Sequence, residues 1–128
     1  MAEHRQRARV GYIDTDASGL IYFTAVFRWV EAAEIELYRK LGLLDGSIRL
    51  PRRQVEAEYL LPIRFDDEIE VTLRVERVGT TSVTYSWDAL LRGEVAARGR
   101  FTVVHTGPSG RAEPLPDRVK ALLESPAE

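Results

Sequence analysis

Residues 20–44 read LIYFTAVFRWVEAAEIELYRKLGLL, and this stretch decides the fold. Its apolar residues recur at the spacing of one face of an α-helix, and they are Val26, Val30, Ala33, Leu37 and Leu41. Phe27 and Trp29 add apolar surface on other sides, so we expect a long helix that is enclosed on most sides. Gly42 is expected to end this helix.

Outside the helix, apolar and polar residues alternate with the period of a β-strand. Turn residues at Gly79 and at Arg92–Gly93 separate consecutive strands, and short turns imply antiparallel pairing. The single long helix must then cover one face of the sheet, which is an α+β arrangement of two layers. The expected strands are residues 8–13, 54–61, 68–76, 82–89 and 94–105, and a short helix is expected at 117–123.

Length and composition exclude several classes of protein. The 128 residues suit one domain, residues 1–128. There are no cysteines, which excludes disulfides and a cysteine nucleophile and fits a cytoplasmic location. The net charge of −2 gives no support for nucleic-acid binding. No apolar run approaches the roughly 20 residues that span a bilayer, and no signal peptide is expected at the basic start of the chain.

Candidate catalytic groups are concentrated in the loop DTDASG, residues 14–19, between the first strand and the long helix. Helix starts expose backbone N–H groups and carry partial positive charge. A carboxylate beside such donors offers a base or nucleophile together with a polariser for a carbonyl oxygen. The same residues are ordinary turn formers, and from physical chemistry alone a turn is the stronger interpretation. A calcium loop is excluded because its twelfth position would be Ala25.

The two histidines form no catalytic constellation. His4 is expected in a mobile terminus, and His105 is expected on a sheet face near the end of the last strand. No GxSxG motif occurs, which argues against a serine nucleophile. Two separate histidines also do not suffice for a histidine-rich metal site.

Residues 10–31, VGYIDTDASGLIYFTAVFRWVE, resemble the 4-hydroxybenzoyl-CoA thioesterase family of hotdog proteins, and most closely its branch of Tol-Pal-associated acyl-CoA thioesterases. The shared pattern is an aromatic residue, then D-T-D-x-x-G, an aliphatic pair, a tyrosine and an arginine–tryptophan pair. Residues 59–68, YLLPIRFDDE, resemble a second element of that family. The resemblance implies the hotdog fold, in which an antiparallel sheet of about five strands wraps around one long central helix.

The same resemblance implies an acyl-CoA thioesterase with Asp16 as its catalytic residue. Asp16 would act either as a nucleophile that forms a mixed anhydride or as a general base that activates water. The thioester carbonyl would accept a hydrogen bond from the backbone N–H of Tyr22 or Phe23. No metal or bound cofactor is implied, since CoA enters as part of the substrate. A homodimer at least is implied, and homotetramers are common among relatives.

The resemblance also implies a set of substrate-binding residues. An acyl pocket lined by Phe23, Phe27 and Tyr59 would suit an apolar or aromatic acyl group. Close relatives often carry histidine where this chain has Phe23, and Asn-Tyr where it has Ala25-Val26, so their acyl preference does not transfer. The full expected set is Gly19, Tyr22, Phe23, Phe27 and Tyr59.

One alternative site lies on the helix. Another hotdog thioesterase branch uses a glutamate of the central helix, and Glu31, Glu34 and Glu36 are available for that role. The stronger interpretation is that Glu36 forms an ion pair with Lys40 and that the other two face solvent or an interface.

Two alternative functions also stay open. One is hydrolysis of acyl groups from an acyl-carrier protein in a polyketide-type pathway, and the other is a non-catalytic module that binds acyl chains or a protein partner.

The CoA phosphates would need cationic partners. The candidates are Arg52, Arg53, Arg64, Arg74, Arg77, Arg98 and Arg100.

Overall fold

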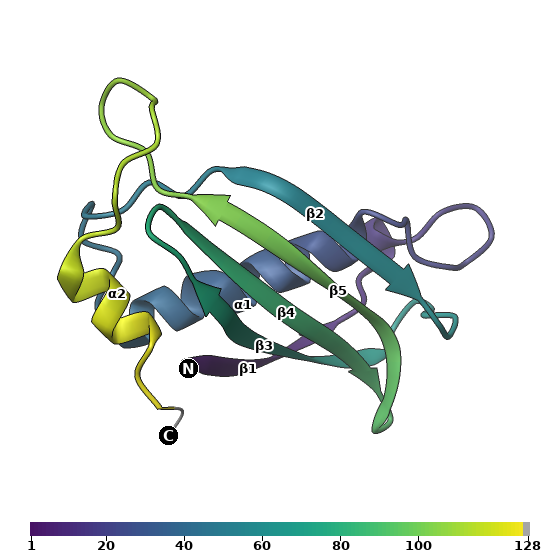
Figure 1. The fold of residues 1–128 in the computed structure, drawn as a ribbon. Coiled ribbons are helices and arrows are strands. Elements are labelled where there is room, and N and C mark those ends of the chain that lie inside the picture. Colours follow the sequence, from purple (N-terminus) through teal and green to yellow (C-terminus); the bar gives the residue numbers. More distant parts are fainter. Residues whose placement is uncertain (127–128) are drawn as a thin grey trace.

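Five antiparallel strands form one sheet that wraps around the long helix α1 (Figure 1). A computed structural model describes residues 1–126 of the chain. The order of strands across the sheet is β1-β3-β4-β5-β2. The elements are β1 (Glu3–Arg9), a 3₁₀ turn (Tyr12–Asp14), α1 (Ala25–Leu41), β2 (Arg52–Tyr59), β3 (Glu68–Val78), β4 (Ser82–Leu91), β5 (Glu94–Val104) and α2 (Asp117–Leu123).

The core lies between α1 and the inner face of the sheet. Side chains of β4 alternate strictly between buried and half-buried, as the period of two predicts. The buried set includes Tyr85 and Trp87 on β4, which face the predicted stripe of α1 that contains Val30 and Leu37. Burying each large apolar side chain stabilises the fold by about 1.5–3 kcal/mol. None of the helices within residues 1–126 is long and apolar enough to cross a bilayer.

Helix α1 ends where the sequence predicts but begins later. Gly42 adopts a left-handed conformation with φ 73°, and its N–H donates to the carbonyl oxygen of Arg39. The apolar pattern places the helix start near Leu20, whereas the helix begins at Ala25. Leu20 and Ile21 instead lie in an extended segment that pairs with residues 63–64, through a Leu20–Arg64 bridge and a hydrogen bond from the N–H of Ile21 to the carbonyl of Ile63.

The first strand differs from its predicted position at residues 8–13. Strand β1 runs over Glu3–Arg9 and pairs with β3, so His4 lies opposite Leu73 in the sheet rather than in a mobile terminus. Its charged sequence hides the strand, because one side of this edge strand is exposed to water. The chain then turns at residues 11–14, where the Asp14 carboxylate accepts a hydrogen bond from the N–H of Gly11 at 2.8 Å.

Strand β2 lies at the other edge of the sheet. It pairs with β5 rather than with β3, its neighbour in sequence, and residues 60–67 cross the end of the sheet between them. Seven of its eight residues are exposed, including Val55. Figure 1 shows that β2 ends beside the N-terminal end of α1, where the loop before the helix projects beyond the sheet.

Candidate active site

The DTDASG loop is a small hairpin that holds Asp16 near its tip. Its two arms pair through a Thr15–Ile21 bridge. The backbone N–H of Asp16 donates to the carbonyl oxygen of Leu20 at 2.9 Å, and the N–H of Gly19 donates back to the carbonyl of Asp16 at 3.1 Å. Gly19 has a φ of 83°, a conformation that glycine adopts without strain. The turn interpretation of this loop is therefore correct, and it is compatible with a reactive side chain at position 16.

The Asp16 carboxylate is exposed and held through one oxygen. Its Oδ1 accepts hydrogen bonds from the Ser18 hydroxyl and from the Ser18 N–H, the latter at 2.7 Å. These two hydrogen bonds lower the pKa of Asp16 below its ordinary value, the hydroxyl contributing most. Within residues 1–126 the Oδ2 atom has no hydrogen-bond partner. Asp16 is therefore an ionised carboxylate with one oxygen available to react.

Asp14, the other aspartate of the motif, has a structural position. It is 7% exposed, and its carboxylate binds the N–H of Gly11 and the guanidinium of Arg28. Its backbone carbonyl accepts the N–H of Tyr22 at 2.9 Å. Asp14 thus anchors both ends of the loop, and its carboxylate is already engaged by Gly11 and Arg28.

The N-terminal end of α1 presents unpaired donors beside this loop. Thr24 occupies the N-cap position, but its side chain makes no capping hydrogen bond. The N–H of Tyr22 is used by Asp14, whereas the N–H of Phe23 has no acceptor within the described residues. Of the two donors expected from the sequence, Phe23 is therefore the one available to a ligand, and it lies at the positive end of the helix dipole.

The other predicted substrate-binding residues are divided between two positions. The Tyr59 hydroxyl, at the end of β2, donates a hydrogen bond to the carbonyl oxygen of Phe23. Phe23 is 69% exposed and Tyr59 43% exposed, so both rings are accessible. Phe27 is half-buried and packs against the core. The structure thus brings Tyr59 into contact with Phe23, which follows the loop of Asp16 and Gly19. Tyr22, in the segment that joins this loop to Phe23, is half-exposed.

The helix glutamates differ from their predicted contacts. Glu36 pairs with Arg39 at 3.3 Å, so the predicted Glu36–Lys40 ion pair is wrong, and Lys40 donates to the backbone of β1 instead. Glu34 is 3% exposed, which contradicts its predicted exposure. Both Glu34 oxygens accept hydrogen bonds, so no free oxygen is left for catalysis. Charge pattern alone gives no signal for such a buried acid, because its partner lies on another element.

No second catalytic constellation is found around the histidines. His105 is buried, follows the last residue of β5, and its Nδ1 lies 3.3 Å from the carbonyl oxygen of Glu113. This is a packing contact to backbone rather than a contact to an acid. Among residues 1–126, no three or more histidines, aspartates or glutamates cluster as metal ligands do.

The arginines expected as candidate partners of the CoA phosphates differ in whether they already form an ion pair. Arg52, Arg74, Arg98 and Arg100 each pair with a carboxylate. Within the described part of the chain, the remaining three have no carboxylate within 4.0 Å, and these are Arg53, Arg64 and Arg77.

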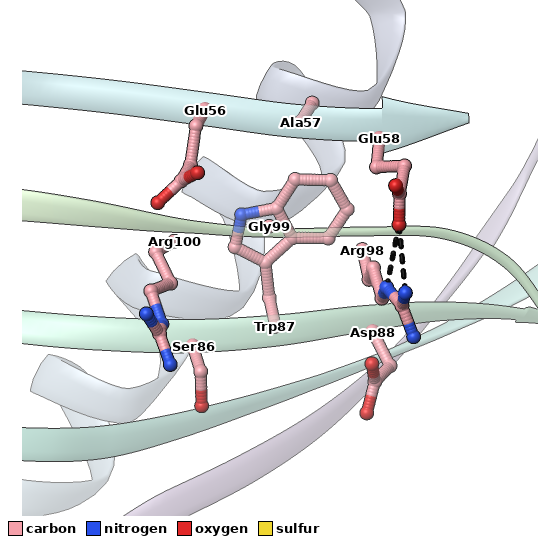
Figure 2. Close-up of a pocket in the computed structure, with 9 residues that line it drawn as sticks. All are labelled: Glu56, Ala57, Glu58, Ser86, Trp87, Asp88, Arg98, Gly99 and Arg100. Carbon is pink, nitrogen blue, oxygen red and sulfur yellow. Dashed lines mark hydrogen bonds and ion pairs between the residues drawn. The ribbon is translucent and has the colours of Figure 1, made fainter.

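A hollow of about 550 Å³ lies over β2, β5 and β4, away from the Asp16 loop (Figure 2). Its rim carries paired ions such as Arg98 and Glu58, which are 2.8 Å apart. Figure 2 shows the Trp87 ring reaching across Gly99 toward β2, where the ring takes the space that a side chain at position 99 would need. None of the residues that line it belongs to the loop before α1, so we do not assign catalysis to it.

Comparisons with known proteins bear on the family of this chain. A sequence profile described as the thioesterase-like superfamily matches residues 10–123. The chain is 28% identical to a 1,4-dihydroxy-2-naphthoyl-CoA hydrolase of Synechococcus sp. (strain CC9605), over 91% of this chain and 86% of that protein. It is 29% identical to the acyl-CoA thioester hydrolase YbgC of Escherichia coli O6:H1, over 64% of this chain and 65% of that protein.

The fold is shared with solved structures. A crystal structure of a protein from Aquifex aeolicus superposes with a TM-score of 0.88 and 25% identity, over 94% of this chain and 98% of that one. The narrower resemblance to the Tol-Pal-associated branch stays a prediction. The profile match covers most of the chain, and relatives are named thioester hydrolases. The chain therefore belongs to the thioesterase-like superfamily and has the hotdog fold of those enzymes.

Proposed function

We propose that this protein hydrolyses acyl-CoA thioesters to a free acid and CoA, with Asp16 as the catalytic residue. The observation that carries the proposal is the ionised Asp16 carboxylate, with Oδ2 free, on the same loop as the unpaired N–H of Phe23. The Thr15–Ile21 bridge and the hydrogen bond from Tyr22 to Asp14 hold the two arms of this loop side by side. Thioester chemistry is supported by the names of the relatives.

The reaction proceeds by one of two routes from this geometry. In the first, Oδ2 of Asp16 attacks the thioester carbon, the C–S bond breaks, and CoA leaves as a thiolate. Water then cleaves the mixed anhydride to the free acid and restores Asp16. In the second, Oδ2 removes a proton from a water that attacks the same carbon. The C–S bond then breaks, CoA leaves as a thiolate, and the proton held by Asp16 passes to that thiolate, which restores the carboxylate. In both routes the N–H of Phe23 donates to the developing oxyanion, aided by the helix dipole.

The acyl group is proposed to be apolar or aromatic. The exposed rings of Phe23 and Tyr59 are joined by the hydrogen bond from the Tyr59 hydroxyl to the Phe23 carbonyl, and Phe27 lies in the first turn of α1. Aromatic faces favour a planar or apolar acyl group over a charged one. The relative that is named for a dihydroxynaphthoyl-CoA substrate is consistent with an aromatic ring.

A homodimer is proposed as the smallest active assembly. Strand β2 is an eight-residue edge strand, and an edge with unpaired backbone groups is a template for pairing with another chain. Pairing with β2 of a second copy would join the two sheets and bring each Asp16 loop close to the interface. A cytoplasmic location and cofactor-free hydrolysis are part of the same proposal.

The deciding experiment is thioester hydrolysis across a panel of acyl-CoA substrates, followed by thiol release, for the wild type and for Asp16→Asn. The substitution keeps the shape and turn propensity of the side chain while removing its charge. We expect kcat to fall about 100- to 10,000-fold with unchanged circular dichroism. If Asp16→Asn turns over at the wild-type rate, Asp16 is only a turn residue. Turnover of acyl-carrier substrates alone would identify the carrier-protein alternative.

A further inference from the structure

The peptide that joins Phe23 to Thr24 lies just before helix α1, because Thr24 is the N-cap and the helix begins at Ala25. The N-cap carbonyl is the first one that a helix uses as an acceptor, so the carbonyl of Phe23 takes no part in the helical hydrogen bonds. The N–H of Phe27 donates to the carbonyl oxygen of Thr24 at 3.1 Å. The carbonyl of Phe23 therefore accepts no hydrogen bond from the helix, and it accepts one from the Tyr59 hydroxyl instead.

Two peptide planes meet at the Cα of Phe23, and the structure holds both. The preceding plane carries the free N–H of Phe23, and its own carbonyl, on Tyr22, accepts the N–H of Ala25 at 3.0 Å. The following plane carries the carbonyl that Tyr59 binds. Because both planes rotate about bonds to one Cα, fixing the second plane limits the directions that the first can take. Tyr59, at the end of β2, thus restrains the direction of the Phe23 N–H.

We propose that Tyr59 is a positioning residue that aims the Phe23 N–H at the thioester oxygen, and not merely part of the acyl pocket. The proposal rests on the proposed thioesterase function. It assigns the hydroxyl group, rather than the ring, as the part of Tyr59 that matters for rate. The side chain reaches Phe23 from the last residue of β2, so it joins the edge of the sheet to the helix start.

The state of the Tyr59 hydroxyl suits this task. Burial raises the pKa of Tyr59 above its ordinary value of 10.0, so the group stays protonated and remains a donor throughout the neutral range. No other donor to the Phe23 carbonyl is found within residues 1–126, so removing the hydroxyl frees that plane.

The test compares Tyr59→Phe with the wild type and with Tyr12→Phe as a matched control. Tyr12 is 82% exposed and packs edge-on against Phe65, so its variant also loses one phenolic hydroxyl near the same loop. We expect Tyr59→Phe to lower kcat about 10- to 100-fold, with KM within about twofold, because small misplacements of catalytic groups are that costly. Tyr12→Phe should leave both unchanged.

A second readout is independent of turnover. In an amide NMR spectrum, Tyr59→Phe should shift the Phe23 and Thr24 resonances, because the peptide between these two residues loses its hydrogen bond to Tyr59. Unchanged resonances would overturn the coupling even if the enzyme were inactive on every substrate tested. Wild-type kcat in Tyr59→Phe, or a change in KM alone, would show that the ring only lines the pocket. A wild type without thioesterase activity would refute the proposed function, while the resonance shifts would still report whether Tyr59 holds the peptide.

Discussion

Arg52 of β2 donates two parallel hydrogen bonds to the carboxylate of Glu34 on α1, at 3.0 and 2.5 Å. Glu34 also accepts the hydroxyl of Tyr38 at 2.6 Å, and that hydroxyl lies 2.8 Å from the hydroxyl of Tyr85. The guanidinium of Arg52 stacks 4.4 Å above the Phe101 ring. Burial is the largest single influence on the pKa of Arg52 and lowers it, but the hydrogen bonding to Glu34 and the negative charge of Glu34, with smaller contributions from Tyr38 and Glu31, together raise it. A buried charge network therefore connects the edge strand to the helix.

Replacing Arg52 and replacing Glu34 should lower the free energy of unfolding by unequal amounts. The Glu34 side chain is 4% exposed and Arg52 is 34% exposed, so only the arginine can reach water when its partner is lost. We expect Arg52→Met to lower the free energy of unfolding by about 3–5 kcal/mol, because it strands a buried carboxylate. Glu34→Gln should cost only about 1–3 kcal/mol.

Urea unfolding of both variants and of the double variant measures this asymmetry. The double variant should be more stable than Arg52→Met alone, because it contains no stranded charge. Equal losses in the two single variants would contradict the assignment of Glu34 as the buried member.

Ser18→Ala should move the acid limb of the activity profile to higher pH. The Ser18 hydroxyl is the largest cause of the lowered pKa of Asp16, so its removal raises that pKa toward the ordinary value of 3.8. Both proposed routes need the ionised carboxylate, so activity in the variant is lost at a higher pH as the solution is acidified. The rate near neutral pH should be largely retained.

The measurement is kcat/KM against pH, with circular dichroism at each pH to confirm that the protein stays folded. An acid limb that moves to lower pH, or no movement at all, would argue against Asp16 as the titrating group.

Gly99→Ala should open the sheet between β5 and β2. A Cβ at position 99 would lie 2.0 Å from the carbonyl oxygen of Glu56 and 2.6 Å from the Trp87 ring. Backbone cannot yield as a side chain does, so the strands must separate, and we expect a loss of about 1–3 kcal/mol or more in unfolding free energy. Gly11→Ala is a useful contrast, since its nearest neighbour would be at an ordinary 3.5 Å. Thermal unfolding that ranks Gly11→Ala as the more damaging change would refute this account.

Val55→Asp should prevent association without unfolding the subunit. Val55 is 49% exposed on the edge strand, so the new carboxylate is solvated in the monomer. In a two-fold symmetric interface the same charge appears twice, and like charges repel across the paired strands. Sedimentation equilibrium should give twice 14.5 kDa for the wild type and 14.5 kDa for the variant. A dimeric variant would place the interface elsewhere.

The sequence predicts those elements whose signal is local. The alternation in β4 and the glycine at the end of α1 depend on near neighbours along the chain, and both predictions are confirmed. Helix α2 also has its predicted bounds. In contrast, β1 is a charged strand at the edge of the sheet, and the extended conformation of Leu20 depends on its pairing with a segment more than forty residues away.

The candidate site follows the same rule. The motif identifies Asp16 as the reactive candidate, and the structure adds the hydrogen bonds that keep it ionised. The choice of Phe23 over Tyr22 as the free donor depends on Asp14, whose carbonyl occupies the other N–H. The contact between Tyr59 and Phe23 cannot be predicted from the periodicity of the sequence, and neither can the burial of Glu34. Each depends on a residue of β2 that lies far away along the chain, Tyr59 in the first case and Arg52 in the second.

Strand β2 is held at both of its ends, through Tyr59 to the residue just before the N-cap of α1 and through Arg52 to Glu34 on α1. A ligand that binds along β2 therefore contacts a strand that is hydrogen-bonded, through Tyr59, to the peptide of Phe23. If that ligand is a second copy of the chain, the specific activity becomes a function of protein concentration. Dilution in an assay would then slow each molecule, and rates measured at different enzyme concentrations would fail to fall on one straight line.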